Sequence, residues 1–250
     1  MEPDKSGDPN NDKDAYKNKD GKTDVKTLSE VVIKSQKNTS TERAQPVPQN
    51  SIPKANFKVA NKYTSNFEGG WSNKQQDPGG ATMRGIIFNN FKVWAQPDLG
   101  IVPTIDNLKN LTESQASILY KKHYWSKISG DDFEDGNVAF SIYDFSVQSG
   151  QGIKQVEKRM YATFGGGITV NGKLTKEEVT LLNKVNGRQL FHLIQDTRLS
   201  YVHHVIKMNV NAYFKTHPLA TLKELQQYTL LGLQKGLENR VNNIKYKTSK

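Results

Sequence analysis

Cysteine is absent from the 250 residues, so the chain can form no disulfide and has no thiolate for metal binding or covalent catalysis. Apolar runs long enough to cross a membrane are missing as well. Met1 is followed by acidic and polar residues, whereas a secretory signal has a basic and then an apolar stretch. We therefore expect no membrane span and no signal peptide. A substrate outside the cytoplasm would then require release by lysis, dedicated secretion or delivery by a particle.

Metal and cofactor motifs are also missing. None of the five histidines forms a His-Glu-x-x-His pair, and the adjacent His203 and His204 would point about 100° apart on a helix. Gly165-Gly166-Gly167 lacks the Lys-Ser/Thr of a phosphate-binding loop, and the acidic run 131–135 lacks the alternating ligands of a calcium loop. The sequence therefore predicts no metal site and no cofactor.

Hydrophobic residues are few, at 35%, and mean hydropathy is −0.71. Residues 1–50 account for much of this, because they contain no Trp or Phe and carry nine basic and nine acidic side chains. Such a segment buries too little apolar surface to offset its chain entropy, so we expect a polar N-terminal arm. The net charge of +10 then belongs to residues 51–250, with 26 basic and 16 acidic residues. A basic body attracts nucleic acid or an anionic cell wall, but the aromatic and basic motifs of known nucleic-acid-binding modules are missing, which favours the wall.

From Ile52 onward the pattern is mainly helical. Phe57, Ala60, Tyr63 and Phe67 recur at helical spacing and predict an inner helix face. Capping boxes at Thr112-x-x-Gln115 and Thr175-x-x-Glu178 predict two helix starts. Apolar spacing predicts the other helices, over about 86–94, 138–150, 153–164, 188–209 and 222–244, with a break at 97–103 and a small irregular hairpin within 71–83. The expected fold class is mainly α, with that hairpin beside the candidate site.

The candidate chemistry lies in two neighbouring segments, Phe67-Glu68-Gly69-Gly70-Trp71 and Asp77-Pro78-Gly79-Gly80-Ala81-Thr82. Glycosidic bond cleavage requires a protonated acid and a carboxylate that attacks or activates water. Glu68, at a helix end between aromatic residues, is placed to stay protonated, whereas Asp77 in a polar turn is placed to stay ionised. Each also has a simpler interpretation, because helix-end glutamates are usually solvated and Asp before Pro-Gly-Gly often only forms a turn.

Three further residues are candidate substrate-binding positions. Trp71 follows the Glu-Gly-Gly segment, and Tyr124 belongs to an aromatic pair that could stack on a sugar or fill the core. Asp144, on an apolar helix, could lie near Glu68, or could be a structural hydrogen-bond acceptor.

These segments resemble glycoside hydrolase family 108, muramidases related to the phage-type lysozymes. The resemblance rests on Glu68-Gly69-Gly70, on Asp77-Pro78-Gly79-Gly80-x-Thr82 and on Gly85-Ile86. Supporting matches are Tyr120-x-x-x-Tyr124-Trp125, Asp144-Phe145-Ser146-Val147-Gln148-Ser149-Gly150, Asn171-Gly172-Lys173-Leu174-Thr175, Arg198-x-x-Tyr201 and Gly236-Leu237-Glu238-Asn239-Arg240. The last three resemble the peptidoglycan-binding region predicted in that family. The Asp–Thr interval is one residue shorter than in phage-type lysozymes, and Leu237 replaces the usual tryptophan.

The resemblance implies a lysozyme-like domain that cleaves the β-1,4 bond between N-acetylmuramic acid and N-acetylglucosamine, with Glu68 as general acid and Asp77 and Thr82 handling water. It implies a catalytic region at 51–130 and a helical region at 131–250 that resembles a peptidoglycan-binding domain and packs on the first. Peptidoglycan is the expected partner, and residues 1–50 could dock on phage or contractile-particle proteins. Two alternatives stay open: a lytic transglycosylase, and a non-catalytic particle component that kept the fold.

Overall fold

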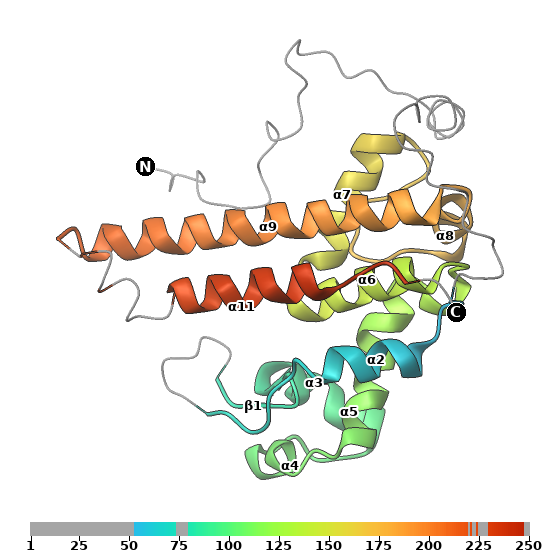
Figure 1. Ribbon diagram of the computed structural model, residues 1–250. Coiled ribbons are helices and arrows are strands. Elements are labelled where there is room, and N and C mark those ends of the chain that lie inside the picture. Colours follow the sequence, from blue (N-terminus) through green and yellow to red (C-terminus); the bar gives the residue numbers. More distant parts are fainter. Residues whose placement is uncertain (1–52, 74–79, 220, 222–223, 225–229, 248–250) are drawn as a thin grey trace, which may run out of the picture.

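The structure, a computed structural model, describes residues 53–73, 80–219, 221, 224 and 230–247, most of them in helices. Figure 1 shows the arrangement. In chain order the described α-helices are α2 (Phe57–Ser65), α3 (Phe88–Leu99), α4 (Ile105–Lys109), α5 (Glu113–Tyr120), α6 (Gly136–Gln148), α7 (Gly152–Phe164), α8 (Lys176–Leu182), α9 (Gly187–Thr216) and α11 (Leu230–Asn243). The π-helix η2 (Lys121–Trp125) and the 3-10 turns η3 (Ser126–Ile128) and η4 (Gly130–Asp132) connect α5 to α6.

The hairpin is short and tight. Strand β1 (Thr82–Met83) pairs antiparallel with β2 (Ile86–Ile87), and Ser72 bridges to Thr82. Arg84 and Gly85 form the two-residue turn with φ angles of 49° and 73°, the left-handed geometry typical of tight hairpins. The fold class is thus confirmed as mainly α with a small β-hairpin.

Helix α6 is the centre of the molecule. Nine of its residues are buried, from Asn137 to Ser146, because its sequence is apolar around most of its circumference. It packs against α2, α7 and α9, and α9 packs against α11. In Figure 1, α9 and α11 run side by side below α7, while α4, α5 and the hairpin form the lower part, with α2 between.

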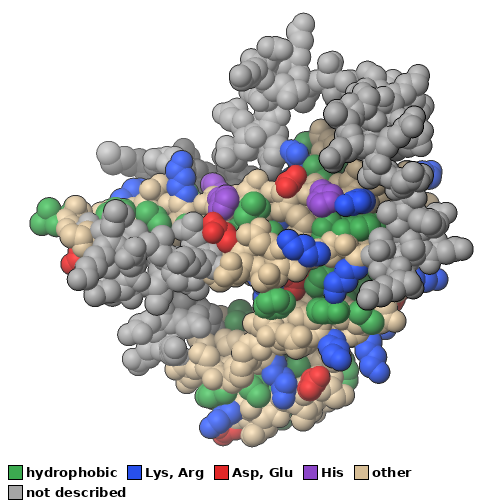
Figure 2. All heavy atoms as spheres, viewed as in Figure 1, with side chains coloured by type: hydrophobic (Ala, Val, Ile, Leu, Met, Phe, Trp, Pro, Cys, Tyr) green, Lys and Arg blue, Asp and Glu red, His purple; other side chains and the backbone are tan. Residues whose placement is uncertain are grey.

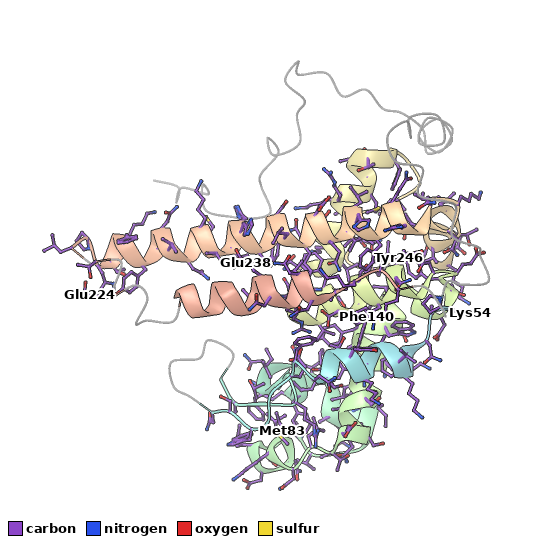
Figure 3. The ribbon with its side chains drawn as sticks, viewed as in Figure 1. Lys54, Met83, Phe140, Glu224, Glu238 and Tyr246 are labelled. Atoms are coloured by element: carbon purple, nitrogen blue, oxygen red, sulfur yellow. The ribbon has the colours of Figure 1, made fainter. Side chains whose placement is uncertain are left out.

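The segment after α11 is fastened to the start of α6. Tyr246 Oη donates to Asp135 Oδ2 at 2.7 Å, and Lys247 N donates to Asn137 Oδ1 at 2.9 Å. On its other side, α11 contacts α9 through His203 Nε2 and Glu238 Oε1, 2.9 Å apart; Figure 3 labels Glu238 between these two helices. These contacts fix the position of α11 over the end of α2.

The predicted capping boxes at Thr112 and Thr175 are both confirmed. The predicted inner face of α2 is wrong in part, because the helix buries Ala60 and Thr64 while the side chains of Tyr63 and Phe67 remain 46% exposed. The physical reason is that Thr64 hydrogen-bonds to α6, which turns the smaller residues inward. Figure 2 shows hydrophobic side chains on this face beside basic ones, and Lys247 Nζ lies 4.1 Å from the centroid of the Tyr63 ring.

Three boundaries also differ from prediction, and the first is the end of α9, which runs to Thr216 where the prediction ended at about 209. Ile86 and Ile87 are in strand β2, and α3 begins only at Phe88. The break expected at Pro97 comes later, since α3 contains Pro97 and ends at Leu99, where Gly100 takes a left-handed cap with φ of 67°. Among the described helices, none has both the length and the hydrophobicity that a bilayer crossing requires.

Candidate active site

Glu68 lies just beyond α2, where its backbone N–H donates to the Ser65 carbonyl at 3.2 Å. Its side chain is 16% exposed and faces a small pocket between α2, the hairpin turn and α5. The other residues lining that pocket are Asn61, Ser65, Arg84, Glu113, Ala116, Ser117 and Tyr120. The pocket has a volume of about 30 Å³, room for about one water molecule, so Glu68 is a shielded carboxyl with a small exposed surface.

The hairpin turn approaches Glu68 so closely that only glycine fits at position 85. A Cβ atom on Gly85 would lie 2.3 Å from Glu68 Oε2 and 2.3 Å from Tyr120 Oη, far inside contact distance. The Tyr120 hydroxyl donates to the Arg84 carbonyl at 2.8 Å, which anchors the turn to α5. Gly85 therefore has two roles: it permits the left-handed turn and leaves room for the carboxyl.

A network of charged groups reaches Glu68 from the helical core. Arg240 of α11 donates through Nη1 to Glu68 Oε1 at 3.1 Å, and through Nη2 and Nε to Asp144 Oδ1 and Oδ2 at 2.8 and 3.1 Å. Asp144 also accepts from Arg198 Nη2 at 2.7 Å and from Thr64 Oγ1 at 2.8 Å. Arg240 thus couples the candidate acid to a buried carboxylate, and the Phe67 ring, 5.0 Å from the guanidinium carbon, covers it.

The two carboxyl groups have opposite environments. Burial raises the pKa of Glu68 above its ordinary value; Arg240 opposes this, and the charge of Asp144 adds to it. Burial acts in the same sense on Asp144, but its bonds to Arg240 and Arg198 outweigh it and lower the pKa of that carboxyl. Burial and the Glu68 charge raise the pKa of Tyr124 to about 12, so that phenol stays neutral. Glu68 is therefore biased toward carrying a proton, and Asp144 toward a permanent charge.

The other predicted site residues are spread around this centre. Thr82 is on β1, where its hydroxyl donates to the Gly80 carbonyl at 3.1 Å. Trp71 is half-buried beside the hairpin, with Lys109 Nζ 6.0 Å from the centroid of its ring. Tyr124 is half-buried on η2, with its ring centroid 5.5 Å from that of Tyr120. Asp77 lies outside the described residues, so its predicted role stays a prediction.

Asp144 does not fit a direct contact with substrate, since its side chain has no exposed surface. Its contacts agree instead with the alternative of a structural hydrogen-bond acceptor. No group of three or more potential metal ligands occurs among the residues that the structure describes.

Sequence reasoning missed Arg198 and Arg240 as parts of this centre. The motifs that contain them predict a peptidoglycan-binding region instead. The missed signal was Asp144 itself, the one ionisable acid in an otherwise uncharged helix, which requires cationic partners once that helix is buried. The centre therefore draws on both predicted regions, 51–130 and 131–250.

The chain is similar to a known family and to a solved structure. Residues 61–150 match the model of the family Glycosyl hydrolase 108, which confirms the resemblance to that family and includes Glu68, Tyr124 and Asp144. The match ends before the motifs of the predicted peptidoglycan-binding region, so that part of the resemblance stays a prediction. The match supports a glycoside hydrolase and implies peptidoglycan as its substrate.

A solved structure, that of Brucella abortus SagA, superposes with a TM-score of 0.52 at 21% sequence identity, over 75% of this chain and 94% of the other. That similarity supports a shared fold over most of the chain. A search of curated proteins gives no match.

Proposed function

We propose that this protein is a muramidase that hydrolyses the β-1,4 bond between N-acetylmuramic acid and N-acetylglucosamine, with Glu68 as the general acid. The observation that carries the proposal is the shielded carboxyl of Glu68, which opens on a pocket inside the segment that matches the glycosidase family. A glycosidic oxygen leaves readily only when it is protonated, and an acid kept protonated near neutral pH can supply that proton.

In this mechanism Arg240 holds the Glu68 side chain in place. Its bond to Oε1 leaves Oε2, the oxygen beside Gly85 and Tyr120, as the one that carries the proton to the substrate. After the proton has left, the Arg240 charge stabilises the Glu68 carboxylate. Asp144 serves as a positioning residue that holds Arg240.

The water step is assigned to Asp77 and Thr82. Attack on the opposite face of the sugar inverts the anomeric centre and requires carboxyl groups about 6.5–9.5 Å apart, whereas about 5 Å indicates a retaining mechanism. The basic surface of the protein holds the anionic wall, an attraction that weakens as salt rises.

The decisive test is a turbidity assay on purified sacculi. Glu68→Gln keeps the shape of the side chain but cannot donate its proton, so we expect the rate to fall by about 10²–10⁴-fold. Glu134→Gln, an exposed position outside the site, removes the same charge and serves as the matched control. Undiminished cleavage by the Glu68 variant would overturn the assignment of the acid.

The products decide between hydrolysis and transglycosylation. Hydrolysis adds water and leaves a reducing N-acetylmuramic end, whereas a lytic transglycosylase leaves an anhydro end lighter by one water. Mass spectrometry of digested sacculi separates these outcomes. Absence of any cleavage by the wild-type protein, with its fold intact, would favour the non-catalytic particle component.

A further inference from the structure

A second pocket, of about 330 Å³, has none of the lining residues of the Glu68 pocket, although its Tyr124 ring lies 5.5 Å from the Tyr120 ring of that pocket. We call it the Trp94 pocket; its principal lining residues are Trp94, His123, Tyr124, Lys127, Lys154 and Gly172. They come from α3, η2, η3, α7 and the turn before Leu174. Its volume is in the range of ordinary ligand sites.

The aromatic wall of this pocket is held in place from behind. The rings of Trp94 and His123 stack with centroids 4.0 Å apart and planes 9° apart, and the Tyr124 ring meets Trp94 edge-on at 6.1 Å. A nearly inaccessible carboxylate, that of Asp98, pairs with His123 Nε2 and with Lys122 Nζ. The stacked rings of Trp94 and His123 are therefore held rigidly, and the Asp98 carboxylate is directed toward His123 and Lys122.

The opposite side is held in the same way by a second buried acid. Glu157 is fully buried, and its two carboxylate oxygens accept from Gly172 N at 3.0 and 2.8 Å. Leu174 N donates to the Lys127 carbonyl at 2.8 Å, which joins the turn to η3. A Cβ on Gly172, whose φ is +87°, would lie 3.4 Å from Lys154 Cε, so the aliphatic part of Lys154 crosses the turn at its glycine.

The resulting pocket is cationic. Lys127 and Lys154 are exposed, and no residue lining the pocket is acidic. Neither lysine forms an ion pair with any residue in the described part of the chain. The carboxylate of Asp98 is bound to His123, and that of Glu157 is bound to the backbone of Gly172. Two ammonium groups beside a rigid aromatic wall select an anion attached to an apolar group.

We propose that the Trp94 pocket binds a short peptide through its free carboxylates, with the peptide side chains against the aromatic wall. The choice of peptide rests on the proposed function, because the wall glycan carries short stem peptides that end in carboxylates. The protein would then recognise the peptide and the glycan in two neighbouring pockets, and cleavage would favour strands that still carry peptides.

The test is binding of a synthetic stem tetrapeptide with free carboxylates to the full-length Glu68→Gln protein, measured by calorimetry. We expect saturable binding, and about tenfold weaker binding by a Lys127→Gln/Lys154→Gln double variant, since two exposed ammonium groups that each add a modest attraction are removed together. The same peptide with its carboxylates converted to amides should bind at least as weakly. Lys207→Gln/Lys215→Gln on α9 removes equal charge elsewhere and should change nothing.

Equal binding of the amidated peptide, or unchanged binding by the Lys127/Lys154 variant, would overturn the proposal. Preference for a phosphate-rich wall polymer over the peptide would overturn it too. Because the assay uses no glycan, its outcome is independent of the muramidase proposal. Peptide binding without glycan cleavage would overturn only the muramidase proposal. Glycan cleavage without peptide binding would overturn only the peptide proposal.

Discussion

Replacing Arg240 by Gln tests the coupling between Glu68 and the core most directly. The change removes the cation that favours ionised Glu68, while Asp144 keeps Arg198 and stays negative. Both effects favour the protonated form, so the pKa of Glu68 rises further. Because the general acid works only when protonated, we expect the alkaline limb of the pH–rate profile to move to higher pH.

The same substitution also weakens the fold. Arg240 is 11% exposed and makes three charge-assisted hydrogen bonds, two of them to a fully buried carboxylate. Loss of one partner from a buried ion cluster costs about 3–5 kcal/mol, and the remaining bonds of Asp144 to Arg198 and Thr64 reduce this to about 2–4 kcal/mol. For a chain of this size the melting temperature should fall by about 5–15 °C.

The assay measures initial rates on solubilised glycan strands between pH 4 and 9, well below the melting temperature, with circular dichroism to confirm folding. Arg240→Lys keeps the charge but loses the paired contacts to Asp144, so its alkaline limb should lie nearer that of the wild type. A folded Arg240→Gln protein whose alkaline limb stays in place, or moves to lower pH, would refute the reasoning.

Three further outcomes follow. Gly85→Ala should cut activity by at least tenfold, because its Cβ would displace the Glu68 carboxyl and Tyr120. The control is Gly80→Ala, since Gly80 has a similar φ but open space around an added Cβ. Equal losses of activity in the two variants would contradict this prediction. Thr64→Val should lower the free energy of unfolding by about 1–3 kcal/mol in denaturant titrations, since Asp144 loses the hydrogen bond that the Thr64 hydroxyl donates. Removal of residues 1–50 should leave cleavage of sacculi intact. Loss of cleavage would show that this arm is needed for activity.

Much of the fold could be predicted because its signals are local. The capping boxes at Thr112 and Thr175 were recognisable from the hydrogen-bonding capacity of side chains three residues apart. The inner face of α2 could not be predicted in the same way. Tyr63 and Phe67 have helical spacing, but the hydrogen bond from Thr64 to Asp144 of α6 sets the rotation of α2. Apolar spacing cannot include such a contact.

In the candidate site, too, only the residues with a local sequence signal could be predicted. Glu68 could be found because its Glu-Gly-Gly context is compact in the sequence. Arg240 could not be assigned to it, because 172 positions separate the two residues and only the packing of α11 brings them together. The buried state of Asp144 likewise depends on helices on several sides, which no single segment encodes.

The ion pair between Arg240 and Glu68 also orders events during synthesis. The arginine leaves the ribosome long after the acid that it holds, so the proposed catalytic centre is complete only after residue 240 has emerged. A chain cut short before position 240 lacks the guanidinium that links Glu68 to Asp144. A fragment that ends before position 240 but still folds around α6 would therefore hold the proposed acid, Glu68, without its cationic partner.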